Sequence, residues 1–373
     1  MDVTLRTRRG AGLVALVTAL AIGLTGCTGD LAWPWDEPEP LPTPTETLAA
    51  DTKERKDSPP EPKAPPRERH YWPLTGHEGK PRQMNRPAVS VKIENAPEAR
   101  PTRGLEAADI VWEEVVEGGI TRFVAVYHSR LPDAVEPVRS VRPMDAAIVA
   151  PMKGMLAYSG GQLPFIDRVN RVSTQSLVMD DGHDGFYRDP ARAAPHNVIG
   201  KPREFLAQER GDMRLFSPPP AQFIYAPHAG KGSAAQKGTR ARSLSVRLSN
   251  FQTSNWYWDV RSRTYQRSEG SSPSMAMSGA RHGARNVVVL GVDMVNTAYT
   301  DPSGAPVPET RLVNSSGEGF VAAHGKVKKI RWKKGRIHAP IVLKLANGKQ
   351  AQLEPGNTWV ELVPRSSGSW SVR

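Results

Sequence analysis

The chain contains 373 residues, carries a formal net charge of +12 and has a single cysteine. One thiol excludes an intrachain disulfide, and because Cys27 lies near the N-terminus, the folded part has no thiolate nucleophile and no cysteine-based zinc site. The basic excess is local. Residues 201–373 hold 26 basic and 11 acidic residues, a net of +15, whereas residues 71–200 hold 15 and 16.

Residues 1–26 predict a lipoprotein signal peptide. Three arginines precede the uncharged run AGLVALVTALAIGL, which has the length of a signal-peptide core and is too short for an ordinary transmembrane helix. Cys27 follows Leu-Thr-Gly, which resembles a bacterial lipobox, whose cysteine receives a diacylglyceryl group carrying fatty acids such as palmitate. Two acyl chains suffice for stable anchoring. The alternative is a plain secretory signal with an incidental cysteine.

Residues 27–70 predict the lipidated cysteine and a disordered tether. This segment is rich in Pro, Glu, Asp, Lys and Thr and has almost nothing apolar to bury. The chain that follows is long enough for two domains. The break SPPP at residues 217–220 lies close to the change in charge, so we expect domains at 71–216 and 217–373.

The first of these halves mixes strand and helix signals. AVSVKIEN reads as a strand, and Gly118-Gly119 joins two arms rich in β-branched and aromatic residues, which predicts a β-hairpin. A strand is expected in GMLAYSGG, and short helices are expected over residues 143–150, 162–170 and 201–211, the last stopped by Gly211. We therefore predict an α+β or α/β domain, a mixed sheet with packed helices.

The second half predicts a smaller, β-rich domain. Alternating apolar and polar residues run through SLSVRLSN, NWYWDVRSRTYQR and NVVVLGVDMV. Asn347-Gly348 lies between two further strand-like runs and is a strong hairpin signal. PGNTWVELV then supplies a turn and a closing strand.

Several of these segments resemble the YerB-like lipoproteins, the DUF3048 family. The N-terminal resemblance lies in RPAVSVKIEN, ARPTRGLEAADIVWEEVVEGGITRF, EPVRSVRP, SGG and PHN, in that order. The C-terminal resemblance, to the family's companion domain, lies in DPSG, SSGEGFVAAHGK, RWKK and LEPGNTWVELVP. Together they cover most of residues 85–365. The resemblance implies a secreted, lipid-anchored body of two domains with an α/β N-terminal fold, and it implies no catalytic residue.

Polar residues gather at the predicted turns and strand ends of the first half. Arginine favours ligand binding over catalysis, because its planar fork grips carboxylate or phosphate and does not titrate. Two alternatives stay open: a structural ion-pair network, or acid–base hydrolysis of wall glycan by Glu113 and Glu117. We expect Glu117 and Arg122 to lie near the arginines of EPVRSVRP. The candidate ligand-binding residues are Glu94, Asn95, Glu113, Glu117, Arg122, Arg139, Arg142, His196 and Asn197.

Motifs for hydrolase, calcium-binding or nucleotide-binding sites are incomplete or absent in the sequence. Ser140 or Ser159 with His196 lacks the G-x-S-x-G turn of a hydrolase, and His183 among Asp180, Asp181 and Asp184 lacks the spacing of an EF-hand loop. The sequence contains no P-loop and no dinucleotide fingerprint. We therefore expect no metal, no cofactor and no confident catalytic residue.

The segment GKVKKIRWKKGR predicts contact with an anionic surface. Outside the membrane the available polyanions are acidic wall polymers and lipid headgroups, not nucleic acid, and Trp332 could add a stacking surface. The alternative is a solvated strand face protected from edge pairing. The residues concerned are Lys326, Lys328, Lys329, Arg331, Trp332, Lys333, Lys334 and Arg336.

Taken together, these features predict a lipoprotein on the extracytoplasmic face of the cell membrane. Its body is expected to bind an anionic ligand or an envelope protein. The competing functions are a peptidoglycan hydrolase that uses Glu113 or Glu117, and a non-catalytic scaffold for a membrane-bound wall enzyme.

The lipid anchor is directly testable. Metabolic labelling with a fatty-acid analogue should tag the protein, because Cys27 is the only thiol that can carry the lipid. Cys27→Ser should abolish the tag and release the body into the soluble fraction, as measured by fractionation and in-gel detection. Continued labelling of the serine variant would contradict the lipobox interpretation.

Overall fold

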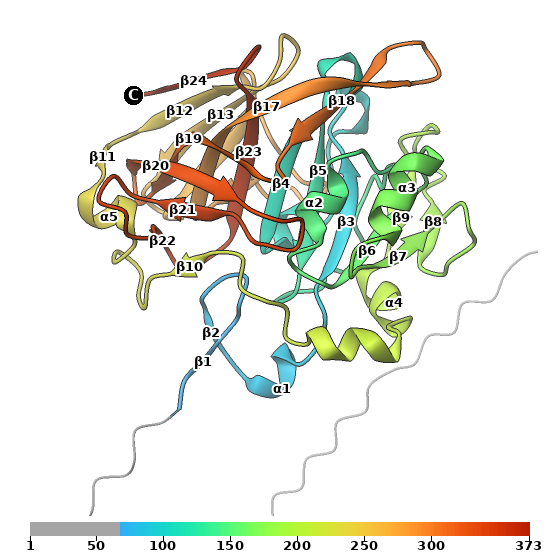
Figure 1. Cartoon of the computed structure of the whole chain (residues 1–373), viewed down its shortest axis with the longest axis horizontal. Helices are drawn as coiled ribbons and strands as arrows, with labels where there is room; N and C mark the ends of the chain where they lie inside the picture. The colour runs from blue at the N-terminus through green and yellow to red at the C-terminus, as the bar shows by residue number, and fades with distance from the viewer. Residues whose placement is uncertain (1–67) are drawn as a thin grey trace, which may run out of the picture. The chain divides into compact units, whose positions relative to one another are not determined.

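The structure, a computed structural model, describes residues 68–373, except for the side chains of residues 214–216. The predicted signal peptide, Cys27 and the tether up to residue 67 lie outside the described residues. Most regular structure in the described part is β-strand, and one large sheet runs through it (Figure 1).

The large sheet contains twelve strands from both halves of the chain. Seven of them, β20, β17, β23, β4, β3, β6 and β7, run in one direction, and β5 runs antiparallel between β4 and β3. The strands in spatial order are β11 (Thr239–Arg240), β20 (Lys326–Lys334), β19 (Ser315–Ala323), β17 (Asn286–Thr300), β23 (Thr358–Pro364), β4 (Ile110–Val115), β5 (Thr121–Tyr127), β3 (Val89–Glu94), β6 (Met155–Tyr158) and β7 (Gln175–Val178), with β18 (Pro306–Arg311) beside β17 and β21 (Val342–Lys344) beside β20.

A six-stranded antiparallel sheet covers one face of the large sheet. Its inward residues Trp256 and Tyr265 share a hydrophobic cluster with Val287 and Trp359 of the large sheet. Phe205 of α4 (Pro202–Ala207) joins the same cluster. The strands are β15 (Ser272–Pro273), β14 (Thr264–Glu269), β13 (Thr253–Asp259), β12 (Ser243–Arg247) and β24 (Ser369–Val372), with β16 (Gly283–Ala284) beside β14.

Short helices pack on the opposite face. Ile148 of α2 (Asp145–Val149) and Phe165 of α3 (Leu163–Asn170) share the second hydrophobic cluster with Trp112 of the sheet. The remaining elements are small: α1 (Pro81–Met84), α5 (Ser233–Lys237), β1 (His70–Tyr71), β2 (Glu78–Gly79), β8 (Phe186–Arg188), β9 (Val198–Gly200), β10 (Ile224–Tyr225), β22 (Gln352–Leu353), η1 (Pro97–Ala99), η2 (Leu105–Ala107), η3 (Glu117–Gly119) and η4 (Gly211–Phe216).

The predicted α+β or α/β fold class is therefore wrong. The described part is mostly β-sheet, and its five α-helices are short, the longest having eight residues. The helix expected over residues 201–211 ends at Ala207, and Gly211 opens a 3-10 turn instead. The C-terminal half also continues the first sheet, because β23 pairs in parallel with both β17 and β4. Pairing between strands so distant in sequence has no local signal.

The predicted hairpin at Gly118-Gly119 is confirmed. β4 and β5 pair antiparallel from Ile110↔Val126 to Val115↔Thr121, and the Val116 amide donates to the Ile120 carbonyl at 2.9 Å. Both glycines adopt left-handed backbone conformations, with φ of 67° and 76°. Glycine is favoured here because a side chain at positive φ clashes with its own backbone.

Gly119→Val should lower the free energy of unfolding by about 2 kcal/mol or more. The left-handed conformation alone costs an ordinary residue ~1–2 kcal/mol, and a Cβ at this position would lie 3.0 Å from Phe251. Urea denaturation measures the loss. Gly211→Val is the control, because a Cβ there meets no atom within 4 Å and the backbone is not left-handed. Equal losses in the two variants would contradict the explanation.

Candidate functional site

Strand alternation places the predicted polar residues on opposite faces of the large sheet. On β4, Val111 belongs to the cluster under the six-stranded sheet and Trp112 to the cluster under α2. Since successive side chains point to opposite faces, Glu113 faces the six-stranded sheet and Glu114 faces α2. By the same rule Arg122, which precedes Phe123 of the first cluster, lies on the α2 face.

Six of the nine candidates come together at the end of β3 and the start of β5. We call these residues the arginine cluster: Glu94, Glu117, Arg122, Arg139, Arg142 and His196. Glu94 and Arg122 are direct neighbours across β3 and β5. Glu94 also binds Arg139, with 3.1 Å between Nε and Oε1, and His196, with 2.9 Å between Nδ1 and Oε2. The Glu94 carboxylate therefore links β3 to the two segments that carry Arg139 and His196.

The second carboxylate of the cluster holds the third arginine. Arg142 Nε lies 2.5 Å from Glu117 Oε1, in the turn between β4 and β5. Arg122 donates from Nη1 to the Ser140 carbonyl at 2.9 Å. The expectation that Glu117 and Arg122 lie near the arginines of EPVRSVRP is thus confirmed.

Positive charge is in excess within the arginine cluster. Arg122 is 4% exposed, and its pKa falls to about 9, first because of burial and then because of the charges of Arg142 and Arg139. Glu117 and Glu94 oppose this shift only in part. The Arg122 Nε is buried and has no hydrogen-bond acceptor among the described residues. An anion at this position would supply the missing acceptor and offset the repulsion between the guanidinium groups.

A fully buried ion triad supports the cluster from beneath. Lys92 Nζ pairs with Glu114 and lies 2.8 Å from Asp145 Oδ1, and all three side chains are inaccessible. Burial, and next the charge of Asp145, raise the pKa of Glu114 to about 8 despite Lys92. Asp145 Oδ2 also accepts the Arg142 backbone amide at 2.6 Å and so fixes its turn. The sequence-based candidates did not include Lys92 or Asp145. The signal for Lys92 was a charge within an apolar strand, and the signal for Asp145 was a charge at the start of a helix.

Glu113 belongs to a separate buried network on the other face. Arg267 Nη2 donates to its two oxygens at 2.9 and 2.7 Å, and Arg267 also pairs with Glu269. Asn95 donates to Glu113 at 3.3 Å. Burial, and then Glu113, raise the pKa of the adjacent Glu361 well above its ordinary value. Arg267 was missed because it lies 154 positions from Glu113.

This arrangement removes the carboxylate pair that the hydrolase alternative needs. Glu113 is 0% exposed and bound to Arg267, whereas Glu117 binds Arg142 at the opposite face. Asn197 also lies apart from the arginine cluster, accepting from Arg188 at 2.9 Å. His196 uses Nδ1 to bind Glu94 Oε2 at 2.9 Å, so this nitrogen is not paired with Ser140 or Ser159.

The basic segment forms β20, and alternation corrects part of the predicted surface. Trp332 is 1% exposed and donates from Nε1 to the Gly291 carbonyl at 3.1 Å, so it is a core residue and offers no stacking surface. Lys334 is also buried, donating to the Ile337 carbonyl at 2.8 Å, and burial lowers its pKa to about 8. Lys326 donates to the Ala235 carbonyl at 2.7 Å.

The exposed cations of this segment form a narrower row. Lys329, Arg331 and Lys333 alternate with the buried residues of β20, and Arg336 follows beyond the strand; all four are exposed. Lys328 is half-buried. Arg331 lies 3.7 Å from Glu318 of β19, and both side chains are largely exposed. The anionic-surface prediction therefore concerns this row alone.

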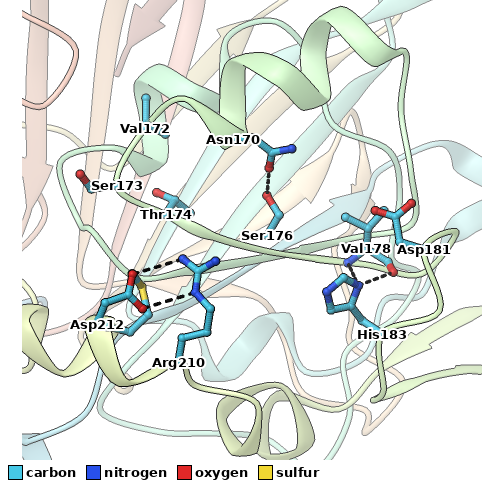
Figure 2. A pocket seen from close by; sticks show the side chains of 11 residues that line it. Asn170, Val172, Ser173, Thr174, Ser176, Val178, Asp181, His183, Arg210 and Asp212 are labelled. Atoms are coloured by element: carbon cyan, nitrogen blue, oxygen red, sulfur yellow. Dashed lines mark hydrogen bonds and ion pairs between the residues drawn. The ribbon is translucent and has the colours of Figure 1, made fainter.

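A cavity of 640 Å³ beside β7 offers little chemistry (Figure 2). Several of its polar groups are paired with each other: Arg210 Nε lies 3.3 Å from Asp212, and Ser176 donates to Asn170 at 2.7 Å. His183 bonds the Val178 backbone, as the dashed lines in Figure 2 show. No group of three or more potential metal ligands occurs within residues 68–373. We therefore place the candidate site at the arginine cluster.

Comparison with known proteins finds the two domains of one family, in the order in which their motifs occur in the chain. Two family models match, described as the N-terminal domain (residues 74–213) and the C-terminal domain (residues 244–360) of a protein of unknown function, DUF3048. The chain belongs to the DUF3048 family. The arginine cluster lies within the first match, and Arg267 lies within the second.

The sequence relative and the solved structure that match this DUF3048 chain are both of YerB from Bacillus subtilis. The chain is 26% identical over 304 residues to a protein of strain 168 named "Putative lipoprotein YerB", covering 78% of this chain and 86% of that protein. A crystal structure of YerB matches with a TM-score of 0.66 at 23% identity, covering 81% of this chain and 99% of the other. Among the described residues, no helix is long and apolar enough to span a bilayer.

The Glu113–Arg267 pair should be structural in the DUF3048 body. Arg267→Met should lower the free energy of unfolding by about 3–5 kcal/mol, because it leaves a buried carboxylate without its partner. Glu113→Gln combined with Arg267→Met should cost less than the sum of the single changes, as measured by urea denaturation. Arg331→Met is the control, with an expected change within about 0.5 kcal/mol, since its pair with Glu318 is exposed. Additive losses would contradict direct coupling.

Proposed function

We propose that this protein is a lipid-anchored, extracytoplasmic binding protein whose arginine cluster holds an anionic group of the cell envelope. The anchor is proposed from Cys27 and from the name of the B. subtilis relative. The binding role is proposed from the charges and contacts of the arginine cluster.

One observation carries the binding proposal. Three guanidinium groups meet two carboxylates, and the innermost, Arg122, keeps a buried Nε without an acceptor. A buried donor that lacks its partner costs ~1–3 kcal/mol, and an anionic acceptor bound beside it would offset this cost. Arg139 and His196 connect the cluster to solvent, with side chains 22% and 23% exposed. A ligand can therefore reach Arg139 and His196 from solvent.

The chemistry of the cluster selects a small oxyanion. Guanidinium forks bind phosphate and carboxylate through paired hydrogen bonds, and Arg142 presents its side chain 12% exposed beside them. In the envelope such groups occur on wall polymers and on lipid headgroups. The row of Lys329, Arg331 and Lys333 is a second, weaker contact in this proposal, suited to extended polyanions or to an envelope protein. If the protein instead acted as a scaffold for a wall enzyme, the row of Lys329, Arg331 and Lys333 would be its contact surface.

Anion binding should depend on the arginines that reach solvent. Isothermal titration of the full chain with inorganic phosphate and with a short poly(glycerol phosphate) should show binding. Arg139→Ala and Arg142→Ala should each weaken it about tenfold or more, because a hydrogen bond to a charged group contributes ~1.5–3 kcal/mol. Cosedimentation with phosphatidylglycerol vesicles distinguishes a lipid headgroup from a wall polymer.

Arg365→Ala is the matched control, since its pair with Asp293 lies outside the arginine cluster. It should leave phosphate affinity unchanged. Melting temperatures of all three variants separate loss of binding from loss of folding. Equal affinity in Arg139→Ala, Arg142→Ala and the original chain would reduce the arginine cluster to a structural ion-pair network.

A further inference from the structure

A second cavity, of 340 Å³, lies between the two family-matched parts of the chain, away from the arginine cluster. Its walls include the apolar side chains of Leu105 and Phe123, and Met275 stands beside them, 37% exposed. The loop that carries Met275 is held across the cavity by the Met277 amide, which donates to the Thr102 carbonyl at 2.8 Å. Residues from both halves are thus needed to form the walls.

Polar groups converge at one side of this apolar cavity. Arg100 lines it with a side chain 26% exposed, and lies 3.3 Å from Glu269, another lining residue. Arg100 donates from Nε and Nη2 to Asn95 at 3.1 and 2.8 Å. Its Nη1 makes no hydrogen bond within the described residues. The cavity therefore offers one free charged donor.

Two other polar groups of the cavity, Glu269 and His282, already have partners. Glu269 accepts from Gln252 at 2.6 Å and from Ser274 at 3.1 Å, besides its arginine partners. His282 lies 3.0 Å from Ser274, and burial and the charge of Arg267 lower its pKa to about 3, which leaves the ring neutral. A ligand would thus find an acceptor-seeking guanidinium, not a free carboxylate.

We propose that this cavity binds a small compound with an apolar body and a carboxylate head, the head accepting from Arg100 Nη1. Ligand sites are commonly apolar concavities of roughly 300–1,000 Å³ with a few convergent polar groups, and a volume at the lower end selects a body about the size of one aromatic ring. Arg100 remains protonated at neutral pH, since burial, and next Arg267, lower its pKa only to about 10.

The position of the cavity gives the site a rigid base. Arg100, Glu269, Arg267 and Glu113 form a continuous chain of paired charges from the cavity into the core. The core end of this chain is inaccessible to solvent. A head group at Arg100 therefore meets a cation that its neighbours already orient. Little side-chain conformational freedom is then lost on binding.

The test is isothermal titration of the full chain with 4-phenylbutanoate and with 4-phenylbutan-1-ol. The carboxylate should bind about tenfold more tightly, since only it adds attraction between opposite charges to the hydrogen bond with Arg100. Ser272→Trp should weaken binding by about tenfold or more, because Ser272 is exposed and lines the cavity. Ser271→Trp is the matched control, exposed and adjacent but outside the lining, and should bind as the original chain does.

Arg100→Met should abolish the preference for the carboxylate. Arg103→Met is its control, because Arg103 lies in the same loop and pairs with Glu136 outside the cavity. Unchanged affinity in Ser272→Trp, or no binding of 4-phenylbutanoate at all, would overturn the site. Equal affinity for acid and alcohol would overturn the head-group assignment. The Arg139→Ala variant should retain full affinity, which separates this site from the arginine cluster.

Discussion

β23 lies between β17 and β4 and pairs in parallel with both. Parallel neighbours need long crossover connections, and here the crossover spans most of the chain. This pairing places Glu361 opposite Glu113 and Trp359 opposite Val111. It also brings Arg267 of the six-stranded sheet over the Trp359 ring, 4.9 Å from its centroid. The two family-matched parts thereby share one core.

The shared core makes the two faces of the sheet chemically different. On the α2 face, charges of Lys92 and Glu114 lie beneath arginines that reach solvent. On the other face, Glu113 and Arg267 are sealed by aromatic rings. Buried ion pairs gain little net stability compared with apolar residues but are costly to break. The sealed network is therefore costly to break, whereas the arginine cluster keeps Arg139 and His196 in contact with solvent.

The same logic explains why the polar set in the first half separated into two groups. Adjacent positions on a strand point to opposite faces, so Glu113 and Glu114 cannot serve one site. Residues far apart in sequence can, as Glu94, Arg139 and His196 do. In β20 alternation likewise makes Trp332 a core residue between exposed Arg331 and Lys333.

Local signals in the sequence determined the hairpin at Gly118-Gly119, the short helices at α2 and α3, the family and the expected lipid anchor at Cys27. These depend on backbone conformation, periodicity or motif order within a few neighbouring residues, and the sequence carries that information directly. Tertiary structure alone decided that both halves form one sheet, that Glu113 meets Arg267, and that Arg122 Nε stays without an acceptor. The first two features join strands more than a hundred residues apart, where no local propensity specifies which strand becomes the neighbour. The third depends on how the turn that carries Arg139 and Arg142 packs against β5.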